Sequence, residues 1–250
     1  SSNPRQSLVA RFTRQITTPI KKTNNKSDIA VIILSAGVGN RIKSNEPRSL
    51  IKIGGKTLIE HQINFVENNI EDAETIGVFG YSADKIIKKI AGKIRIVENQ
   101  IFDKTNNSES LRLAVNNTNK KNILFFHGDL YFNHEILDGA NFKKSFIVVD
   151  NKGMMKDKEI GVTMAKNKAT ILSYGLSTKW CQIAFMTGKE LKILRSILNK
   201  LKGSRKKLLS FEIINLIISS GGNFECHEPK NMSIIEIDSI KDIKNENFNF

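Results

Sequence analysis

Short apolar runs alternate with helical patterns from Asp28 through the first half of the chain. Residues 29–34 read IAVIIL, a continuous apolar run typical of a strand that is buried on both faces. Residues 57–68 instead place apolar side chains at helical spacing. The same alternation predicts further strands at 75–80, 94–97 and 122–127, and further helices at 82–91 and 108–115. This order predicts a parallel sheet with helices on both faces.

The second half of the chain has closely spaced strand patterns. Strands joined by short polar turns are expected at 145–150, 160–165, 169–174 and 181–186, which favours antiparallel pairing. Apolar helices are expected at 189–201 and 208–219, then strands at 223–228 and 232–237, and a last helix from Ser239. We therefore predict a single α/β domain over residues 28–250. Its sheet is expected to be open, Rossmann-like, mixed but mainly parallel, with an antiparallel excursion.

Residues 1–27 differ from the rest of the chain. They carry several arginines and lysines and no acidic residue. Apolar residues such as Leu8 and Phe12 could line one side of a short helix. Transit peptides share this composition, but we expect a basic N-terminal arm that is mobile or packs on a partner subunit. The sequence leaves the oligomeric state open.

Composition narrows the partners and the compartment. The net charge of +14 could attract nucleic acid. However, the lysines are scattered and no aromatic-plus-basic RNA-binding strand is visible, so nucleic acid is not the expected partner. No apolar run approaches the roughly 20 residues that a membrane helix needs. Cys181 and Cys226 have no metal-binding spacing, and we expect a cytoplasmic protein with reduced cysteines.

A glycine-containing loop follows the first expected strand. Gly37 and Gly39 let backbone N–H groups approach an anion without a side chain in between. Arg41 and Arg48 add fork-shaped, charged donors that suit phosphate. The loop lies at the carboxyl edge of the expected sheet, where open α/β sheets bind their ligands. The spacing therefore predicts a phosphate site, although a plain turn would also contain glycines.

Two common phosphate loops do not match. A Walker loop needs Gly-Lys-Ser/Thr, and the chain has Gly39-Asn40-Arg41. A dinucleotide fingerprint needs a third glycine where the chain has Ile42. The loop must therefore belong to another phosphate-binding class.

Five segments resemble the nucleotidyltransferase family, in the family's order. LSAGVGNRIKSNEPRSLIKIGGKTLIEHQI (34–63) resembles its phosphate-loop signature, and VFGYSADKI (78–86) resembles its V-x-G-Y segment. FDKTNNSESLRLA (102–114) is similar to the T-N-N-x-x-S-L segment of phosphocholine cytidylyltransferases. FFHGDLYF (125–132) and IIEIDSIKDI (234–243) resemble the metal-binding strand end and the closing E-I-D-S segment. The resemblance implies the nucleotide-diphospho-sugar transferase type of fold, and is closest to the phosphocholine branch.

The resemblance assigns nucleotide contacts within these segments. It implies contacts from Ser35, Ala36, Gly37, Gly39, Gly80, Tyr81, Asn106, Asn107 and Ser110. From the residues alone, Asn106 and Asn107 could instead cap the following helix. Gly80 and Tyr81 could likewise form a simple strand-to-helix turn.

The same resemblance makes Arg41 and Arg48 the catalytic phosphate-binding residues. Where the family usually has Pro-Lys, the chain has Pro47-Arg48. Arginine keeps the positive charge but differs from lysine in donor geometry. The role of Arg48 is therefore left open at this point.

Carboxylates at two strand ends suggest a metal site. Asp129 follows the buried run NILFFH, where a carboxylate is unfavourable unless a cation or hydrogen-bond donors compensate it. Glu236 and Asp238 are two residues apart, so on a strand both point to one face. Such oxygen ligands suit Mg²⁺. The resemblance implies that Asp129 and Asp238 hold the ion with Glu236 nearby, while Asp238 could alternatively cap a helix.

The expected activity is transfer of a nucleoside monophosphate from an NTP to a phosphorylated small molecule. CTP is the expected nucleotide because the 102–114 and 234–243 segments resemble the phosphocholine branch. Phosphocholine, aminoethylphosphonate and a sugar or polyol phosphate all remain open as acceptors. A sugar-1-phosphate nucleotidyltransferase that uses another NTP is one alternative. A non-catalytic nucleotide- or nucleic-acid-binding protein is another. A glycosyltransferase would need D-x-D, and residues 129–131 are Asp-Leu-Tyr.

Overall fold

A nine-stranded sheet forms the centre of the protein in a computed structural model that describes residues 28–37, 46–153 and 155–238. The strand order is β5-β4-β1-β6-β11-β8-β12-β10-β9. Its first half is parallel throughout, formed by β1 (Ile29–Ser35), β4 (Glu74–Phe79), β5 (Arg95–Glu98) and β6 (Asn122–His127). The N-terminal arm and the helix expected from Ser239 lie outside the described residues.

The second half of the sheet is mixed. It contains β8 (Phe146–Asp150), β9 (Ile160–Ala165), β10 (Lys168–Tyr174), β11 (Thr178–Thr187) and β12 (Glu225–His227). Strand β11 is antiparallel to both β6 and β8, whereas β12 is parallel to β8. Strands β10 and β11 run against all the others. The predicted fold class, an open and mainly parallel α/β sheet with an antiparallel excursion, is confirmed.

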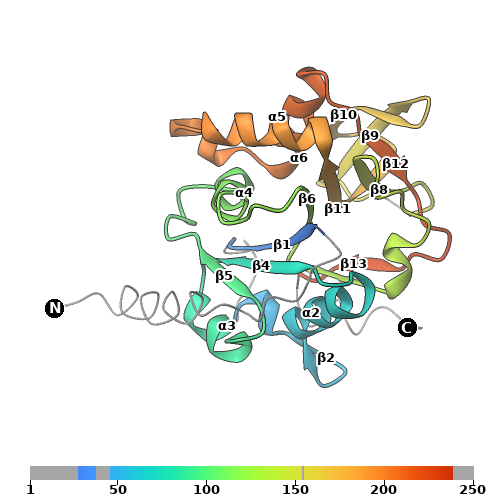
Figure 1. Ribbon diagram of the computed structural model, residues 1–250. Coiled ribbons are helices and arrows are strands. Elements are labelled where there is room, and N and C mark those ends of the chain that lie inside the picture. Colours follow the sequence, from blue (N-terminus) through green and yellow to red (C-terminus); the bar gives the residue numbers. More distant parts are fainter. Residues whose placement is uncertain (1–27, 38–45, 154, 239–250) are drawn as a thin grey trace.

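Helices cover both faces of this sheet (Figure 1). On one face lie α4 (Asn107–Val115), α5 (Gly188–Asn199) and α6 (Ser210–Ser219). On the other lie α2 (Leu58–Asn69) and α3 (Ala83–Ile90). Because side chains alternate along a strand, β1 contributes to two apolar cores. Ala30, Ile32 and Leu34 pack in one core, and Val31 and Ile33 pack in the other, which explains the uninterrupted apolar run.

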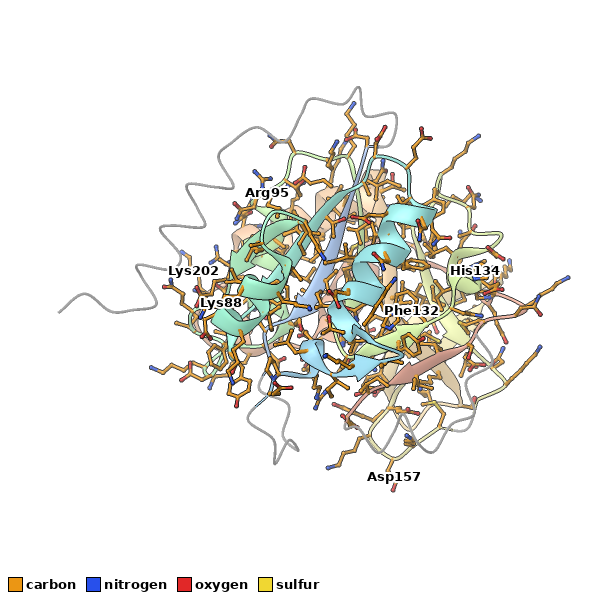
Figure 2. The ribbon with its side chains drawn as sticks, turned by 90° about the horizontal axis from the view of Figure 1, so that it is seen from below. Lys88, Arg95, Phe132, His134, Asp157 and Lys202 are labelled. Carbon is orange, nitrogen blue, oxygen red and sulfur yellow. The ribbon has the colours of Figure 1, made fainter. Side chains whose placement is uncertain are left out.

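Aromatic residues fill the core beneath α2. The ring of Phe132 contacts Phe65 of α2 edge-on at a centroid distance of 4.8 Å and Phe126 of β6 at 5.3 Å. In Figure 2, Phe132 lies inside the molecule while Asp157 and His134 lie at its periphery. This packing fixes β7 (Leu130–Phe132), the strand that follows Asp129.

Several short elements were not predicted. They comprise the hairpin of β2 (Lys52–Ile53) and β3 (Lys56–Thr57), strand β7, and the 3₁₀ turns η1 (Arg48–Leu50), η2 (His134–Leu137) and η3 (Gly203–Lys207). Elements this short give no detectable hydrophobic period. The predicted strand near 232–237 is present as β13 (Ile234–Glu236), which pairs with β7 rather than with the main sheet.

Candidate active site

A pocket of about 180 Å³ opens at the carboxyl edge of the parallel strands. Strands β1 and β6 end beside it, and since they are parallel, the residues that follow them meet at one edge. The pocket is lined by Leu34, Ser35, Gly37, Pro47, Arg48, Ser49, Tyr81, Asn107, His127, Gly128 and Asp129. The glycine loop, the turn after β6 and the start of α4 therefore converge on one cavity.

Arg48 joins two of the expected metal ligands. Its Nη1 donates to Asp129 Oδ2 at 3.0 Å, and its Nη2 lies 3.2 Å from Asp238 Oδ1. The Arg48 and Asp129 side chains are only 19% and 17% exposed, so water screens this pair weakly. Pro47 is extended and caps η1, which begins at Arg48. This turn fixes the backbone of Arg48.

Pairing of β13 with β7 brings the third carboxylate to the same place. Glu236 lies opposite Leu130, and the Ile237 N–H donates to the Asp129 carbonyl at 2.7 Å. A strand more than a hundred residues later in the chain thus delivers Glu236 and Asp238 to Asp129. The cluster depends on this pairing, which the sequence did not predict.

Burial raises the pKa values of two of these carboxyls, those of Asp129 and Glu236. Burial raises the pKa of Asp129, and the neighbouring Arg48 opposes the rise. Burial raises the pKa of Glu236 to about 7, with a further contribution from the negative charge of Asp129. Asp129 Oδ1 is buried and has no hydrogen-bond partner among the described residues. Clustered carboxyls with an unsatisfied buried oxygen are what a bound cation would stabilise.

The oxygen donors fit a cation whose coordination would be completed by a substrate phosphate. No group of three or more His, Cys, Asp or Glu side chains within 28–37, 46–153 and 155–238 is arranged to enclose a metal ion. Mg²⁺ is usually held by one or two protein carboxylates, with substrate phosphates and waters completing its octahedron. Asp129 and Asp238, with Glu236 beside them, match this incomplete kind of site.

His127 lies at the end of β6 on the wall of the pocket. Its Nε2 is 2.7 Å from Ser210 Oγ of α6 and 3.5 Å from Asn107 Nδ2 of α4. Burial lowers the pKa of His127 to about 4, so the imidazole is neutral near pH 7. A neutral ring tied to two helices suits a positioning role rather than proton transfer.

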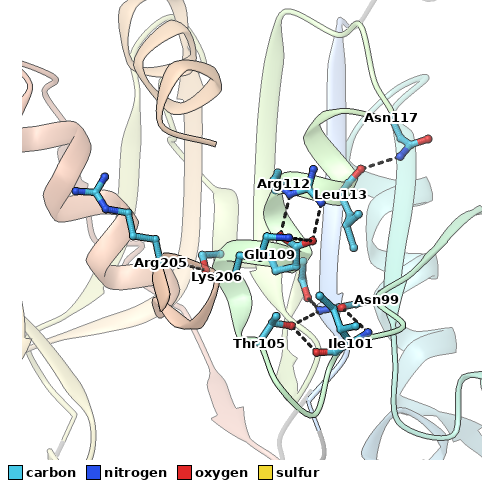
Figure 3. A network of polar contacts seen from close by, with 11 residues as sticks. Asn99, Ile101, Thr105, Glu109, Arg112, Leu113, Asn117, Arg205 and Lys206 are labelled. Atoms are coloured by element: carbon cyan, nitrogen blue, oxygen red, sulfur yellow. Dashed lines mark hydrogen bonds and ion pairs between the residues drawn. The ribbon is translucent and has the colours of Figure 1, made fainter. Parts of the chain in front are cut away.

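A polar network fixes the amino end of α4, which carries the asparagines (Figure 3). The Asn106 N–H donates to the Lys206 carbonyl at 2.9 Å, and Ser108 Oγ donates to the Arg205 carbonyl at 3.0 Å. Within α4, buried Glu109 accepts two hydrogen bonds from Arg112, at 2.6 and 2.8 Å. Turn η3 thus holds the helix end from which Asn107 reaches the pocket.

The turn after β4 requires glycine. A Cβ on Gly80 would lie 2.6 Å from Phe102 Cβ and 2.7 Å from the Ala36 carbonyl oxygen. The Tyr81 N–H donates to that same carbonyl at 3.2 Å. Gly80 and Ala36 therefore pack the backbone closely enough for Tyr81 to reach the pocket wall.

Residues 31–140 match the family of MobA-like NTP transferase domains. This range contains the glycine loop, Arg48, the start of α4 and Asp129. Residues 31–140 belong to the nucleotidyltransferase family. The predicted family is confirmed, and the match covers the part of the chain that contributes every residue lining the pocket.

Curated relatives share part of this nucleotidyltransferase region. The bifunctional protein GlmU of Methanococcus vannielii is 32% identical over 117 residues, which are 46% of this chain and 28% of that protein. The 2-C-methyl-D-erythritol 4-phosphate cytidylyltransferase of Pseudoalteromonas translucida is 51% identical over 39 residues, 16% of each protein. The chain spans less than a third of the length of the GlmU relatives it matches.

Solved structures resemble the whole fold. The CTP:phosphocholine cytidylyltransferase LicC of Streptococcus pneumoniae has a TM-score of 0.71 and 22% identity over 87% of this chain and 96% of its own. A putative glucose-1-phosphate thymidylyltransferase of Bacillus anthracis has a TM-score of 0.70 and 15% identity over 89% and 97%. The inositol-1-phosphate CTP transferase of T. maritima has a TM-score of 0.69 and 16% identity over 86% and 91%. At these identities the likeness concerns the fold of the nucleotidyltransferase domain.

The predicted site residues separate into four groups in the structure, one of which is the pair Glu236 and Asp238 beside Asp129 and Arg48. Ser35, Gly37, Arg48, Tyr81, Asn107 and Asp129 line the pocket. Ala36, Gly80, Asn106 and Ser110 are not among its lining residues. Buried Ser110, for example, accepts a hydrogen bond from Asn99 Nδ2 at 3.2 Å, and Asn106 caps α4. Gly39 and Arg41 lie outside the described residues, and the roles of all these residues remain predictions.

Sequence reasoning missed two glutamines that support the nucleotidyltransferase site. Gln62 of α2 donates from Nε2 to the carbonyls of Gly128 and Leu130, at 3.1 and 2.9 Å, and so fixes the turn that bears Asp129. Gln182 interrupts β11 with a φ of 60° at an irregularity in pairing with β8, and its Nε2 donates to Glu236 Oε2 at 3.1 Å. Gln182 gave a signal as a polar residue within the apolar run of residues 180–186, whereas Gln62 lies among polar neighbours and gave none.

Proposed function

We propose that the protein is a nucleotidyltransferase that transfers a nucleoside monophosphate, CMP from CTP, to a phosphorylated or phosphonylated small molecule. Pyrophosphate is the second product. The observation that carries this proposal is the pocket at the carboxyl edge of a parallel sheet, which is lined by Gly37, Arg48 and Asp129. Glu236 and Asp238 lie beside this pocket, next to Asp129 and Arg48. Family membership of residues 31–140 supports the same class of reaction.

The proposed reaction is a displacement at the α-phosphorus of the nucleotide. An acceptor phosphate oxygen forms the new bond to this phosphorus as the bond to the bridging oxygen breaks. The electron pair leaves with pyrophosphate. Because the acceptor oxygen is already anionic, no side chain has to remove a proton, and neutral His127 fits this requirement. Positioning and charge neutralisation then account for the rate.

Residues of the loop have separate tasks in this mechanism. The Gly37 backbone, together with Gly39 and Arg41 of the same signature, holds the β- and γ-phosphates. Arg48 binds the α-phosphate, on which negative charge grows during the displacement. Tyr81 and Asn107, which also line the pocket, contact the nucleoside. Ser35 supports the loop through its hydroxyl contact with Ser49.

Asp129 and Asp238, with Glu236 adjacent, would hold a divalent cation, and Mg²⁺ is the ion that this oxygen donor set suits. When bound, the ion would neutralise charge on the nucleotide and acceptor phosphates. Two glutamines hold the carboxylates in position. Gln62 fixes the Asp129 turn, and Gln182 hydrogen-bonds Glu236.

CTP as the nucleotide is supported by the phosphocholine-type segments in the sequence and by the fold likeness to LicC. Fold likeness to a glucose-1-phosphate thymidylyltransferase supports the second candidate, a sugar-1-phosphate nucleotidyltransferase that uses another NTP. No helix within 28–37, 46–153 and 155–238 has the length and hydrophobicity to cross a membrane. Free, buried Cys181 and Cys226 support a reducing compartment, the cytoplasm, as the place of the reaction.

A screen of substrate pairs tests the proposal. Pyrophosphate release is measured with Mg²⁺ and each of the four NTPs against phosphocholine, aminoethylphosphonate, glycerol phosphate and sugar-1-phosphates. Release that requires CTP and one acceptor supports the proposal, and release with another NTP supports the sugar-phosphate alternative. If no pair reacts although nucleotide binds, transfer to these acceptors is contradicted, and the result favours either an acceptor outside this panel or a nucleotide-binding protein.

A further inference from the structure

Arg48 makes an unusual pair of contacts for a residue expected to bind phosphate. Its two terminal nitrogens are both engaged by carboxylates, one with Asp129 at 3.0 Å and one with Asp238 at 3.2 Å. These are the carboxylates to which the cation is assigned. Without ligands, the guanidinium therefore supplies the positive charge that the cation would otherwise supply.

The ion pair between Arg48 and Asp129 leaves one polar atom of each side chain without a hydrogen-bond partner among the described residues. Asp129 Oδ1 and Arg48 Nε are both buried and have no hydrogen-bond partner within the described part of the chain. A cation could satisfy the carboxylate oxygen, and a phosphate oxygen could accept from the Nε–H. A nucleotide phosphate and a cation that arrive together would satisfy both atoms, whereas a cation alone must displace a half-buried guanidinium from its carboxylate partners.

Arginine is required for this arrangement. Its planar guanidinium presents separate N–H groups to two carboxylates at once, whereas a lysine ammonium is a compact point charge. The extended Pro47 and the turn η1 place Arg48 on the pocket wall, where it also contacts Asp129 and Asp238.

We propose that Arg48 is an exchangeable counter-ion that occupies the carboxylates until the nucleotide draws it away and opens them to the cation. This inference rests on the proposed function, since it assigns the pocket to a nucleotide phosphate. Its consequence is that Arg48 couples the two ligands: the free protein binds a divalent cation weakly, and nucleotide binding strengthens cation binding.

Manganese binding by the nucleotide-free protein tests the inference. Mn²⁺ is titrated at constant pH into the wild-type chain, Arg48→Gln and Arg48→Lys, and bound ion is measured by electron paramagnetic resonance. Removal of one positive charge about 4 Å from the site should tighten Mn²⁺ binding by about tenfold or more in Arg48→Gln. Arg48→Lys keeps the charge but loses the two-carboxylate bridge, and it should bind with an intermediate affinity.

Two further measurements make the result interpretable. Arg95→Gln removes an arginine that pairs with a single carboxylate, Glu74 at 3.0 Å, at the start of β5, and should leave Mn²⁺ binding unchanged. Mn²⁺ should also raise the melting temperature of Arg48→Gln more than that of the wild type, which shows whether the variant is folded and binds.

Mn²⁺ affinity that is equal to or weaker than that of the wild type in both folded Arg48 variants would overturn the inference. Equilibrium dialysis of CTP with the wild-type protein separates this failure from failure of the proposed function. If CTP binds but the variants do not differ, only the exchange is wrong. If CTP and the other NTPs do not bind at all, the proposed function fails.

Discussion

Asp129 has the greatest influence on the site at the scale of single residues. It contacts Arg48, its pKa is raised by burial, and its backbone carbonyl receives the Ile237 N–H. Replacement by Ala should lower turnover at least about a hundredfold, since charge stabilisation in a buried site is worth that much. Pyrophosphate release measures the loss, and circular dichroism checks the fold. Exposed Asp157, replaced by Ala, is the matched control and should keep full activity.

Gln182 provides a second test at this scale. With a φ of 60° it occupies a left-handed conformation that costs a non-glycine residue about 1–2 kcal/mol. Gln182→Gly relieves this strain and Gln182→Ala does not, so the glycine variant should be more stable than the alanine variant by about 0.5–1 kcal/mol. Thermal unfolding measures the difference. Both variants lose the bond to Glu236, and both should lose activity equally. If the alanine variant is the more stable one, the bulge is not strained.

At the scale of elements, a capping box begins α2 and makes its stability depend on pH. Glu60 Oε2 accepts from the Thr57 N–H at 2.8 Å and from Thr57 Oγ at 3.0 Å. These bonds lower the pKa of Glu60, chiefly the bond from the backbone. A lowered pKa stabilises the fold above the ordinary value of about 4.5, and the contribution is lost as pH falls through the lowered value. Urea unfolding at pH 7 and pH 3 should therefore show that the wild type loses more of its free energy of unfolding at low pH than Glu60→Gln does.

The polar network around Glu109 at the start of α4 can be tested in the same way. Glu109 is 2% exposed and is bonded to Arg112 by two contacts, while Lys206 of η3 lies 3.8 Å away. Glu109→Gln should loosen the helix end that carries Asn107, because Arg112 then lacks a charged partner. We expect weaker CTP binding and a destabilisation of about 1–3 kcal/mol. Exposed Glu67→Gln on α2 is the control, and unchanged CTP affinity in Glu109→Gln would contradict the positioning role of this network.

The sequence predicted the long elements well because each carries a clear hydrophobic period. Residues 29–34 were expected as a strand and form β1 over Ile29–Ser35, and the strand expected at 122–127 is β6. The two-residue strands β2 and β3 and the three-residue strand β7 were not predicted, since they carry no period, and the pairing of β7 with β13 was missed with them. For the same reason the sequence could nominate Asp129 and Asp238 as ligands, but it could not predict that Arg48 bridges them.

For the whole molecule, the sheet order predicts that residues 31–140, which match the family, do not fold alone. Residues 31–140 end before β11, which pairs with β6 and closes an otherwise open edge. They also lack α5 and α6, so half of one apolar core would face water. A fragment of residues 28–143 should aggregate or unfold without a cooperative transition, whereas the full chain should unfold in one step. A fragment with a sharp thermal transition would instead indicate two domains.

The proposed function requires that the pocket transfers a nucleotide rather than merely binding it. The most direct measurement follows the label of [α-³²P]CTP in the presence of Mg²⁺ and the candidate acceptors. We predict that the label moves into a new diphosphate-linked product while an equal amount of pyrophosphate is released, and that Asp129→Ala forms neither. Label that stays on CTP with every acceptor, or that appears only as CMP, although CTP binds, would contradict the account.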